Sequence, residues 1–311
     1  MTKKGKRILF AIVLLLISIS MIVIVIASPN GESEEELARK VGKVHLSGPV
    51  TNALASGFGA QGITPGVVAS YLEEAERKNL AGIVFRVDTG GGSVAASQEI
   101  YRLIEDFDKP VVISIGDMSA SGGYYFSAPA DSIVAHRGSL TGSIGVIFQT
   151  INLEGLQEKL GIETETITAG EHKDMLSRKL SEEERGKINA MIDDLYEQFI
   201  ADILKGREIE EEELRAAATG ELFTGKQALE RNLVDELGGM DKALEVAGEK
   251  ADIEDPSYYE FPEPSFFDQL FSASTEIPKL ISKFNSSPEE LLLDRIEEGA
   301  DEVFKYQVPG H

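Results

Sequence analysis

One short stretch has the residue types of a nucleophile site. Asp117–Ser127 (DMSASGGYYFS) follows the apolar run Pro110–Ile115 (PVVISI), whose β-branched residues predict a buried strand. Ser121 would then stand where the strand turns into a helix, beside unpaired N–H groups that attract negative charge and glycines that leave room for a substrate backbone. A nucleophilic serine fits this position, but on these residues alone a serine that only caps the helix is the simpler interpretation.

A second glycine turn follows the preceding strand. The apolar run Ala81–Val87 leads directly into Asp88–Ser93 (DTGGGS). The spacing matches neither GxGxxG nor GxxxxGK[ST], so a nucleotide-binding loop has weak support, and the remaining use of these N–H groups is an oxyanion hole. Two strand–turn–helix units in succession predict parallel strands joined by crossover helices. Both turns are therefore expected at the carboxyl ends of strands, where the sites of such sheets gather.

Local patterns also predict the elements around these turns. A helix is expected after Thr64, and Ala95–Phe107 has helical periodicity between the two strands. Ser181 and Glu184 form a capping box that opens a long amphipathic helix. Further strands are expected at Asp131–Ala135, Val146–Ile151 and Glu163–Thr168.

The composition excludes several classes of function. The chain has 311 residues, of which 42% are hydrophobic, and a formal net charge of −23. Such a surface disfavours nucleic acid, whose phosphates need a basic partner. There is no cysteine, and the four histidines have no zinc-binding spacing, so we expect neither a disulfide nor a metal site. The chemistry must come from hydroxyls, amines and carboxylates.

The N-terminus predicts a membrane anchor. Four of the first seven residues are Lys or Arg, and the uncharged run Ile8–Ala27 is long enough at about 1.5 Å per residue to cross a bilayer core of roughly 30 Å. The positive flank stays in the cytoplasm, so the rest of the chain is expected outside it. A cleaved signal peptide is the alternative, but its apolar region is usually only about 7 to 15 residues long.

A serine nucleophile needs a base, and the residues leave several candidates. They are His136, His172, Lys173 and the nearby acids. A lysine acts as a base near neutral pH only if its ordinary pKa, near 10.4, is lowered by burial away from a counter-ion. The simple interpretation of Lys173 is a solvated loop lysine whose neighbours Glu171 and Asp174 keep it charged.

Five motifs in order carry a family resemblance. RVDTGGG, SASGGYY, SLTGSIGV, EHKDM and FTGKQALERNLVDELGG resemble those of the signal peptide peptidase A family, serine peptidase family S49, in its short Gram-positive form. The resemblance implies an α/β crotonase or Clp-protease-like fold of repeated β-β-α units with a parallel sheet, here preceded by the transmembrane helix. It implies a peptidase without a cofactor.

The resemblance also assigns roles to residues. It implies that Ser121 is the nucleophile, that Lys173 is the general base, and that Ser143 orients the lysine amine. Clp-type proteases use a histidine instead, but the matching position falls near Val146, where this chain has none.

One departure from the family pattern concerns the oxyanion hole. The usual Pro-Gly-Gly of the first glycine turn reads Gly90-Gly91-Gly92 here. We expect Gly91 and Gly122 to donate the two N–H groups. The residues expected to bind substrate are Gly92, Gly123 and Tyr124.

These assignments predict the organisation and the activity of the chain. We expect a basic tip and anchor at 1–28, an acidic linker at 29–42, the catalytic domain at 43–252, and an aromatic C-terminal segment at 253–311 for oligomer packing. The N-terminal residues imply a single-pass protein of the cell membrane with an extracytoplasmic catalytic domain, and the resemblance implies assembly as a ring or dome such as an octamer. Its expected substrates are cleaved signal peptides and other unfolded membrane-proximal peptides. The alternatives are an inactive membrane-anchored scaffold of the same fold and a crotonase-like acyl-CoA enzyme, which the anchor and Ser121 disfavour.

Overall fold

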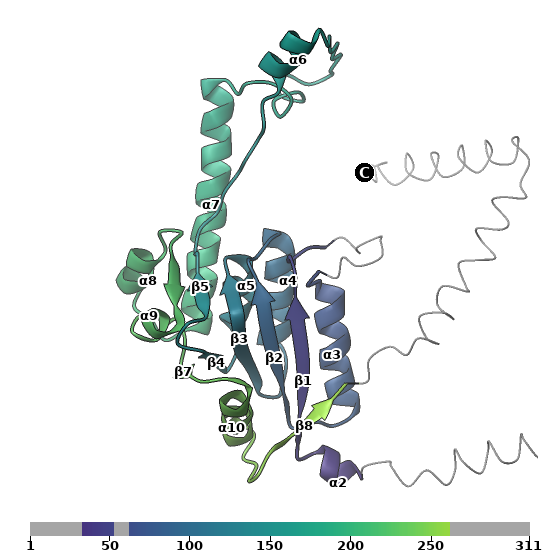
Figure 1. Ribbon diagram of the computed structural model, residues 1–311, viewed down its shortest axis with the longest axis vertical. Coiled ribbons are helices and arrows are strands. Elements are labelled where there is room, and N and C mark those ends of the chain that lie inside the picture. Colours follow the sequence, from purple (N-terminus) through teal and green to yellow (C-terminus); the bar gives the residue numbers. More distant parts are fainter. Residues whose placement is uncertain (1–32, 53–61, 262–311) are drawn as a thin grey trace, which may run out of the picture. The chain divides into compact units, whose positions relative to one another are not determined.

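The computed structural model describes residues 33–52 and 62–261, which form an α/β unit around one sheet (Figure 1). The strand order is β6-β5-β3-β2-β1-β8; off this path, β4 pairs with β3 and β7 pairs with β4. The strands are β1 (Lys40–Ser47), β2 (Gly82–Thr89), β3 (Val111–Ala120), β4 (Ser132–Ala135), β5 (Leu140–Gly142), β6 (Leu222–Thr224), β7 (Glu236–Leu237) and β8 (Ser257–Glu260).

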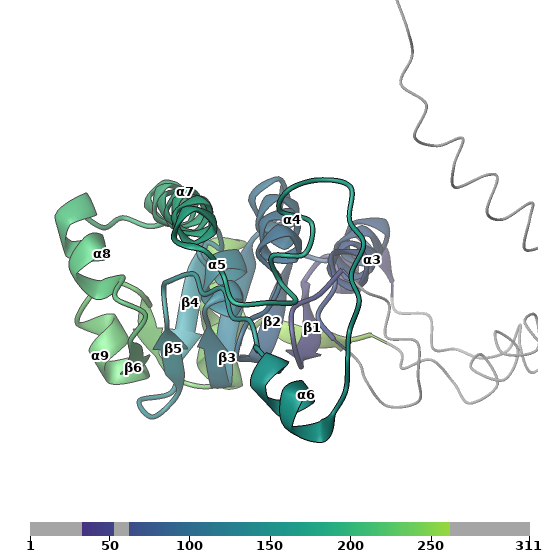
Figure 2. The same cartoon turned by 90° about the horizontal axis from the view of Figure 1, so that it is seen from above.

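Crossover helices make the central strands parallel. α3 (Pro65–Arg77) joins β1 to β2, and α4 (Val94–Glu105) joins β2 to β3. Thr64 and Ser93 cap these helices with their side chains. Figure 2 shows α3, α4 and α7 on one side of the sheet. The central strands are buried runs of β-branched residues, as expected for a sheet covered by helices.

The remaining helices follow the same chain order. They are α2 (Glu34–Leu37), α5 (Gly122–Ser127), α6 (Glu154–Leu160), α7 (Glu182–Gly206), α8 (Glu211–Ala217), α9 (Gly225–Leu229) and α10 (Met240–Lys250). α10 buries Ala243, Val246 and Ala247 against valines of β1, β2, β3 and β4. The capping box of Ser181 and Glu184 opens α7 as the sequence predicts.

β3 changes partner along its length, and this positions the site. Val112–Ile115 pair with β4, whereas Met118–Ala120 pair with β5. Both partners lie on the edge of β3 that faces away from β2. The switch carries β5 to the carboxyl end of β3, where Ala120 is opposite Gly142.

The expected α/β class is confirmed, and the two strand–turn–helix units appear as β2–α4 and β3–α5. The sheet is mixed rather than parallel throughout, because β6 runs antiparallel to β5. β8 pairs with β1, so residues 257–260 belong to the sheet and not to a separate C-terminal segment starting at 253.

Two predicted strands, 146–151 and 163–168, have no regular secondary structure and no strand partner within the part of the chain that the structure describes. They belong to a projection, residues 146–192, which we call the arm; in Figure 1 it rises with the first half of α7 and carries α6 at its tip. Ile147 and Ile167 are 88% and 91% exposed there. Their β-branched residues favour extended backbone, but the arm offers no neighbouring strand to pair with.

The expected anchor, Ile8–Ala27, lies outside the described residues, as do the C-terminal helix and tail. In residues 33–52 and 62–261, none of the helices has both the length and the apolar character needed to cross a bilayer. By its internal contacts the chain divides into two units, Met1–Glu260 and Phe261–His311.

Candidate active site

Ser121 stands at the sharp turn between β3 and α5. Its backbone has φ 53° and ψ −120°, a conformation that residues with a Cβ rarely adopt. The Ser121 N–H donates to Gly142 O at 2.8 Å, and its carbonyl accepts from Tyr125 N at 2.9 Å, which holds the turn from both sides. The side chain does not cap α5. The helix-capping interpretation is therefore wrong, and the hydroxyl projects from a strained strand–helix turn of the kind that presents nucleophiles.

The glycine turn after β2 lies against this serine. A Cβ on Gly91, which has φ +97°, would lie 2.7 Å from Gly122 N and 2.9 Å from Ser121 Cβ. A Cβ on Gly92 would lie 2.1 Å from Val50 O. Only glycine fits at either position. Gly90 has room, because its Cβ would meet only Met118 Sδ at 3.9 Å, so the departure from Pro-Gly-Gly falls at the tolerant position.

Hydrogen bonds distinguish the glycine donors. The Gly91 N–H, which we expected in the oxyanion hole, donates to Thr89 Oγ1 at 3.0 Å in a buried site. Val50 pairs across Gly92, donating to Gly91 O at 3.0 Å and accepting from Ser93 N at 2.9 Å. The backbone groups of Gly92 must then point away from Val50.

The side to which Gly92 points is the side of the serine. A Cβ on Gly122 would lie 3.2 Å from Gly92 N, so these two glycines are adjacent. The Gly122 N–H begins α5 and has no acceptor within the helix. Gly92 is exposed, whereas Gly122 is buried. Gly92 and Gly122 are therefore the candidate pair of donors beside Ser121.

Ser143 is brought to Ser121 by strand pairing. It directly follows Gly142, which is opposite Ala120 and accepts from Ser121 N. Ser143 is half-buried and also has a positive φ, 49°, with its N–H donating to Glu221 O at 2.7 Å. The two serines therefore stand on neighbouring turns at one end of the sheet.

Two residues expected to bind substrate pack inside the protein instead. Tyr124 is 0% exposed, and its hydroxyl donates to Leu233 O at 2.9 Å. Gly123 is buried, and a Cβ there would lie 2.5 Å from Thr89 Cγ2. Glycine at 123 lets α5 approach β2, and Tyr124 fills the core beneath it. Neither Gly123 nor Tyr124 is therefore open to a substrate.

Lys173 lies in a loop beside the first turn of α7, whereas α5, which follows Ser121, packs on a later part of α7. Its neighbour His172 contacts Glu184, in the first turn of α7, with His172 Nδ1 and Glu184 Oε1 3.1 Å apart. The ring of Phe199 packs 4.5 Å from that of Tyr125 in α5. The fifteen residues from Glu184 to Phe199 rise by about 22 Å. Figure 1 likewise shows the arm beyond the strand ends, which separates the loop of Lys173 from the end of β3 within one copy.

A model of peptidase family S49 matches residues 104–254. A putative protease of Synechocystis sp. is 41% identical over 209 residues, covering 66% of this chain and 73% of that protein. A putative protease of Methanocaldococcus jannaschii is 32% identical over 263 residues, which are 82% of this chain and 84% of that one. This chain belongs to peptidase family S49. It is a serine peptidase, and the resemblance seen in its motifs is confirmed.

Other S49 relatives extend the picture. A putative signal peptide peptidase of Enterococcus faecium is 36% identical over 191 residues, which cover 60% of this chain and 56% of that protein. The membrane-bound stomatin-specific protease 1510-N, solved with a substrate peptide, has a TM-score of 0.50 and 16% identity. The match covers 77% of this chain and all of that one. At this identity the match shows a shared fold.

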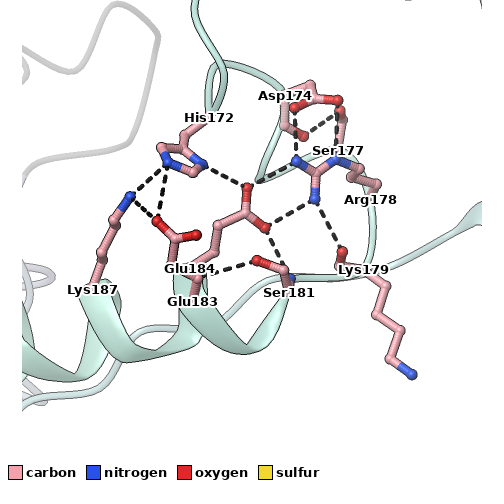
Figure 3. A network of polar contacts seen from close by, with 9 residues as sticks. All are labelled: His172, Asp174, Ser177, Arg178, Lys179, Ser181, Glu183, Glu184 and Lys187. Carbon is pink, nitrogen blue, oxygen red and sulfur yellow. Dashed lines mark hydrogen bonds and ion pairs between the residues drawn. The ribbon is translucent and has the colours of Figure 1, made fainter.

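The S49 chain holds the Lys173 loop in a polar network that sequence reasoning missed (Figure 3). Its members come from the loop and from the start of α7: His172, Asp174, Ser177, Arg178, Lys179, Ser181, Glu183, Glu184 and Lys187. The only sequence signal was the capping box, which placed Glu184 at the start of α7. His136 is exposed, and among the described residues no cluster of His, Asp and Glu could hold a metal ion.

Proposed function

We propose that this S49 peptidase is a membrane-anchored serine endopeptidase with a Ser121/Lys173 dyad. The observation that carries the proposal is the backbone at Ser121, a strained strand–helix turn with two N–H donors beside it. Strain of this kind persists only where the surrounding structure enforces it, and it clusters at active sites.

In the proposed reaction, Ser121 Oγ attacks the carbonyl carbon of a peptide bond. The Lys173 amine takes the serine proton and later returns it to the leaving amine. The N–H groups of Gly92 and Gly122 bind the oxyanion, a contribution of about 3 to 4 kcal/mol per donor. Water then hydrolyses the acyl-enzyme, and the Ser143 hydroxyl orients the lysine amine.

The distance between Ser121 and Lys173 supports an oligomeric site. Since about 22 Å of α7 separates the turn that holds the Lys173 loop from the turn that packs on α5, we propose that the lysine serves Ser121 of a second copy. The exposed apolar side chains of the arm support the same proposal, because an unpaired projection of this kind is the surface that a neighbouring copy would cover. This agrees with the ring or dome that we expected.

Localisation and substrate class complete the proposal. Residues 8–27 would anchor the chain in the cell membrane with its catalytic domain outside the cytoplasm. The substrates would be cleaved signal peptides and other unfolded membrane-proximal peptides. One relative is named a putative signal peptide peptidase, which supports this class. The competing candidate, an inactive scaffold of the same fold, would not need a strained serine.

Mixing two inactive variants tests the dyad and its assembly. Ser121→Ala and Lys173→Ala are each expected to lose cleavage of an apolar peptide. If the lysine acts between copies, co-assembled chains of the two variants regain up to about a quarter of the wild-type activity, because one site in four combines both intact residues. A serine-directed phosphonyl reagent should label wild type and fail to label Ser121→Ala.

The mixing experiment has two informative failures. Full activity of Lys173→Ala alone would remove lysine from the mechanism. Inactive mixtures that contain both chains in one oligomer would show that serine and lysine must come from the same copy. Absence of labelling at Ser121 in an assembled wild-type protein would favour the scaffold.

A further inference from the structure

The loop that carries Lys173 has no regular secondary structure, yet both sequence neighbours of Lys173 are anchored. On one side, His172 Nδ1 lies 3.1 Å from Glu184 Oε1. On the other, Asp174 is held by Arg178 through a two-pronged pair, Nε–Oδ2 and Nη2–Oδ1, both 3.0 Å. Lys173 itself is exposed. The lysine is therefore the free tip between two fixed residues.

Glu184 is the point at which both anchors meet. Its side chain is only 2% exposed and accepts from Arg178 Nη1 at 2.9 Å, Arg178 Nη2 at 2.8 Å and Ser181 N at 2.9 Å, besides contacting His172. The Arg178 guanidinium, with the Ser181 N–H, holds the pKa of Glu184 well below its usual range. A carboxylate that is shielded from water and hydrogen-bonded on both oxygens fixes geometry more firmly than an exposed pair does.

Arg178 also binds the carboxylate of Asp174, which could otherwise pair with Lys173. Asp174 directly follows Lys173, and a free aspartate there would pair with the amine and keep it charged. In the structure both oxygens of Asp174 face Arg178, whose guanidinium lowers the pKa of Asp174. The planar fork of arginine matches two carboxylates at once, which an ammonium group cannot do.

Lys187 makes a further contact that holds His172 in place. Lys187 Nζ lies 2.6 Å from His172 Nε2 and 2.7 Å from Glu183 Oε1. His172 thus bridges Lys187 and Glu184 through its two ring nitrogens. Figure 3 shows these side chains converging on the first turns of α7.

We propose that Glu184 and Arg178 are positioning residues of the peptidase. Together they clamp His172 and Asp174 to the start of α7, so that the Lys173 amine projects at a fixed place and the Asp174 carboxylate is held by Arg178. This inference rests on the proposed role of Lys173 as the base. The clamp acts through the loop backbone and does not touch the substrate.

Two substitutions test the clamp in the full-length, assembled protein. Asp174→Asn removes the charge that holds the loop to Arg178 and leaves the helix cap in place. Glu184→Gln removes the charge of the carboxylate that both His172 and Arg178 contact. Each is expected to lower kcat about 10- to 100-fold, the usual effect of misplacing a catalytic group by about 1 Å. KM should stay within about twofold, because the clamp does not touch the substrate.

A matched control lies on the same helix. Glu197 accepts from Arg215 at 2.9 and 2.6 Å, also in a two-pronged pair, but it is 57% exposed and its partner lies in α8 rather than in the Lys173 loop. Glu197→Gln should leave kcat unchanged. Oligomer size and melting temperature are measured for every variant. If Glu184→Gln fails to assemble, Asp174→Asn carries the test.

Arg178→Lys separates geometry from charge. It keeps the positive charge but loses the fork, so the clamp predicts a loss of kcat like that of Asp174→Asn, together with a shift of the acid limb of the pH–rate profile to higher pH. By contrast, if Asp174→Asn removed only a negative charge near Lys173 and left the loop in place, the acid limb would shift to lower pH.

The outcomes distinguish the clamp from the dyad on which it rests. If Lys173→Ala is inactive while Asp174→Asn and Arg178→Lys keep wild-type kcat and pH profile, the clamp is wrong and the dyad stands. If Lys173→Ala keeps wild-type activity, both are wrong. An inactive Lys173→Ala with reduced kcat in the clamp variants and an unchanged Glu197→Gln confirms the clamp.

Discussion

The strain at Ser121 can be measured by comparing two variants that both lack the hydroxyl. Ser121→Ala keeps a Cβ in the φ 53°, ψ −120° conformation, whereas Ser121→Gly does not. A strained backbone of this kind costs about 1 to 3 kcal/mol. Replacing alanine by glycine also raises the entropy of the unfolded chain, which lowers the stability of the folded protein by about 0.4 to 1 kcal/mol. The glycine variant is therefore expected to be more stable than the alanine variant by about 1 kcal/mol.

The assay is thermal unfolding of the assembled protein at one protein concentration and in one detergent. A difference of about 1 kcal/mol corresponds to about 2 to 4 °C in Tm for a domain of this size. Both variants should be inactive, so the comparison isolates the backbone from the chemistry.

Ser127 gives the control with the opposite sign. It is buried near the end of the same short helix, and its φ is not in the left-handed region. There the alanine variant should be more stable than the glycine variant by about 0.5 to 1 kcal/mol. If Ser121→Ala melts at or above the temperature of Ser121→Gly while the Ser127 pair behaves as expected, the turn at Ser121 is not strained and the case for a nucleophile elbow fails.

Two further predictions follow from the buried groups. Tyr124→Phe leaves Leu233 O without its donor and should cost about 1 kcal/mol of stability, with kcat and KM unchanged in the peptide assay; a raised KM would restore Tyr124 as a substrate contact. The folded pKa of Glu184 is lowered, so its contribution to the loop is present above the ordinary glutamate pKa of about 4.3 and is lost as the pH falls below it. Hydrogen exchange of the amides at 172–178, corrected for intrinsic rates, should stay slow down to about pH 5 and rise below about pH 4. A rise that begins already above about pH 5 would show that Glu184 is not the controlling group.

Local patterns were enough for much of the fold. β-branched runs ending in glycine predicted β2, β3 and the turns after them, and side-chain caps predicted the starts of α3 and α7. These features depend on residues within one or two turns of each other, so the sequence alone carries them. The same holds for the position of Ser121 between strand and helix, and for the motifs that identify the family.

Contacts between distant segments decided the rest. The switch of β3 from β4 to β5 brings Ser143 to Ser121. The pairing of Val50 with Gly92 turns the Gly92 N–H toward the serine, whereas the Gly91 N–H donates to the Thr89 side chain. No local pattern specifies these partners, because backbone groups of any residue can form them.

The arm and the core show the same division. The segments 146–151 and 163–168 have the composition of strands, but a strand needs a neighbour, and the described part of the chain provides none there. Tyr124 has the composition of a site residue, but the packing of α5 on the sheet buries it. Residue types and local motifs were sufficient to predict which residues could do the chemistry. Which of them are exposed and which backbone donors already have a partner depends on the packing of segments far apart in the chain, and no local pattern carries that information.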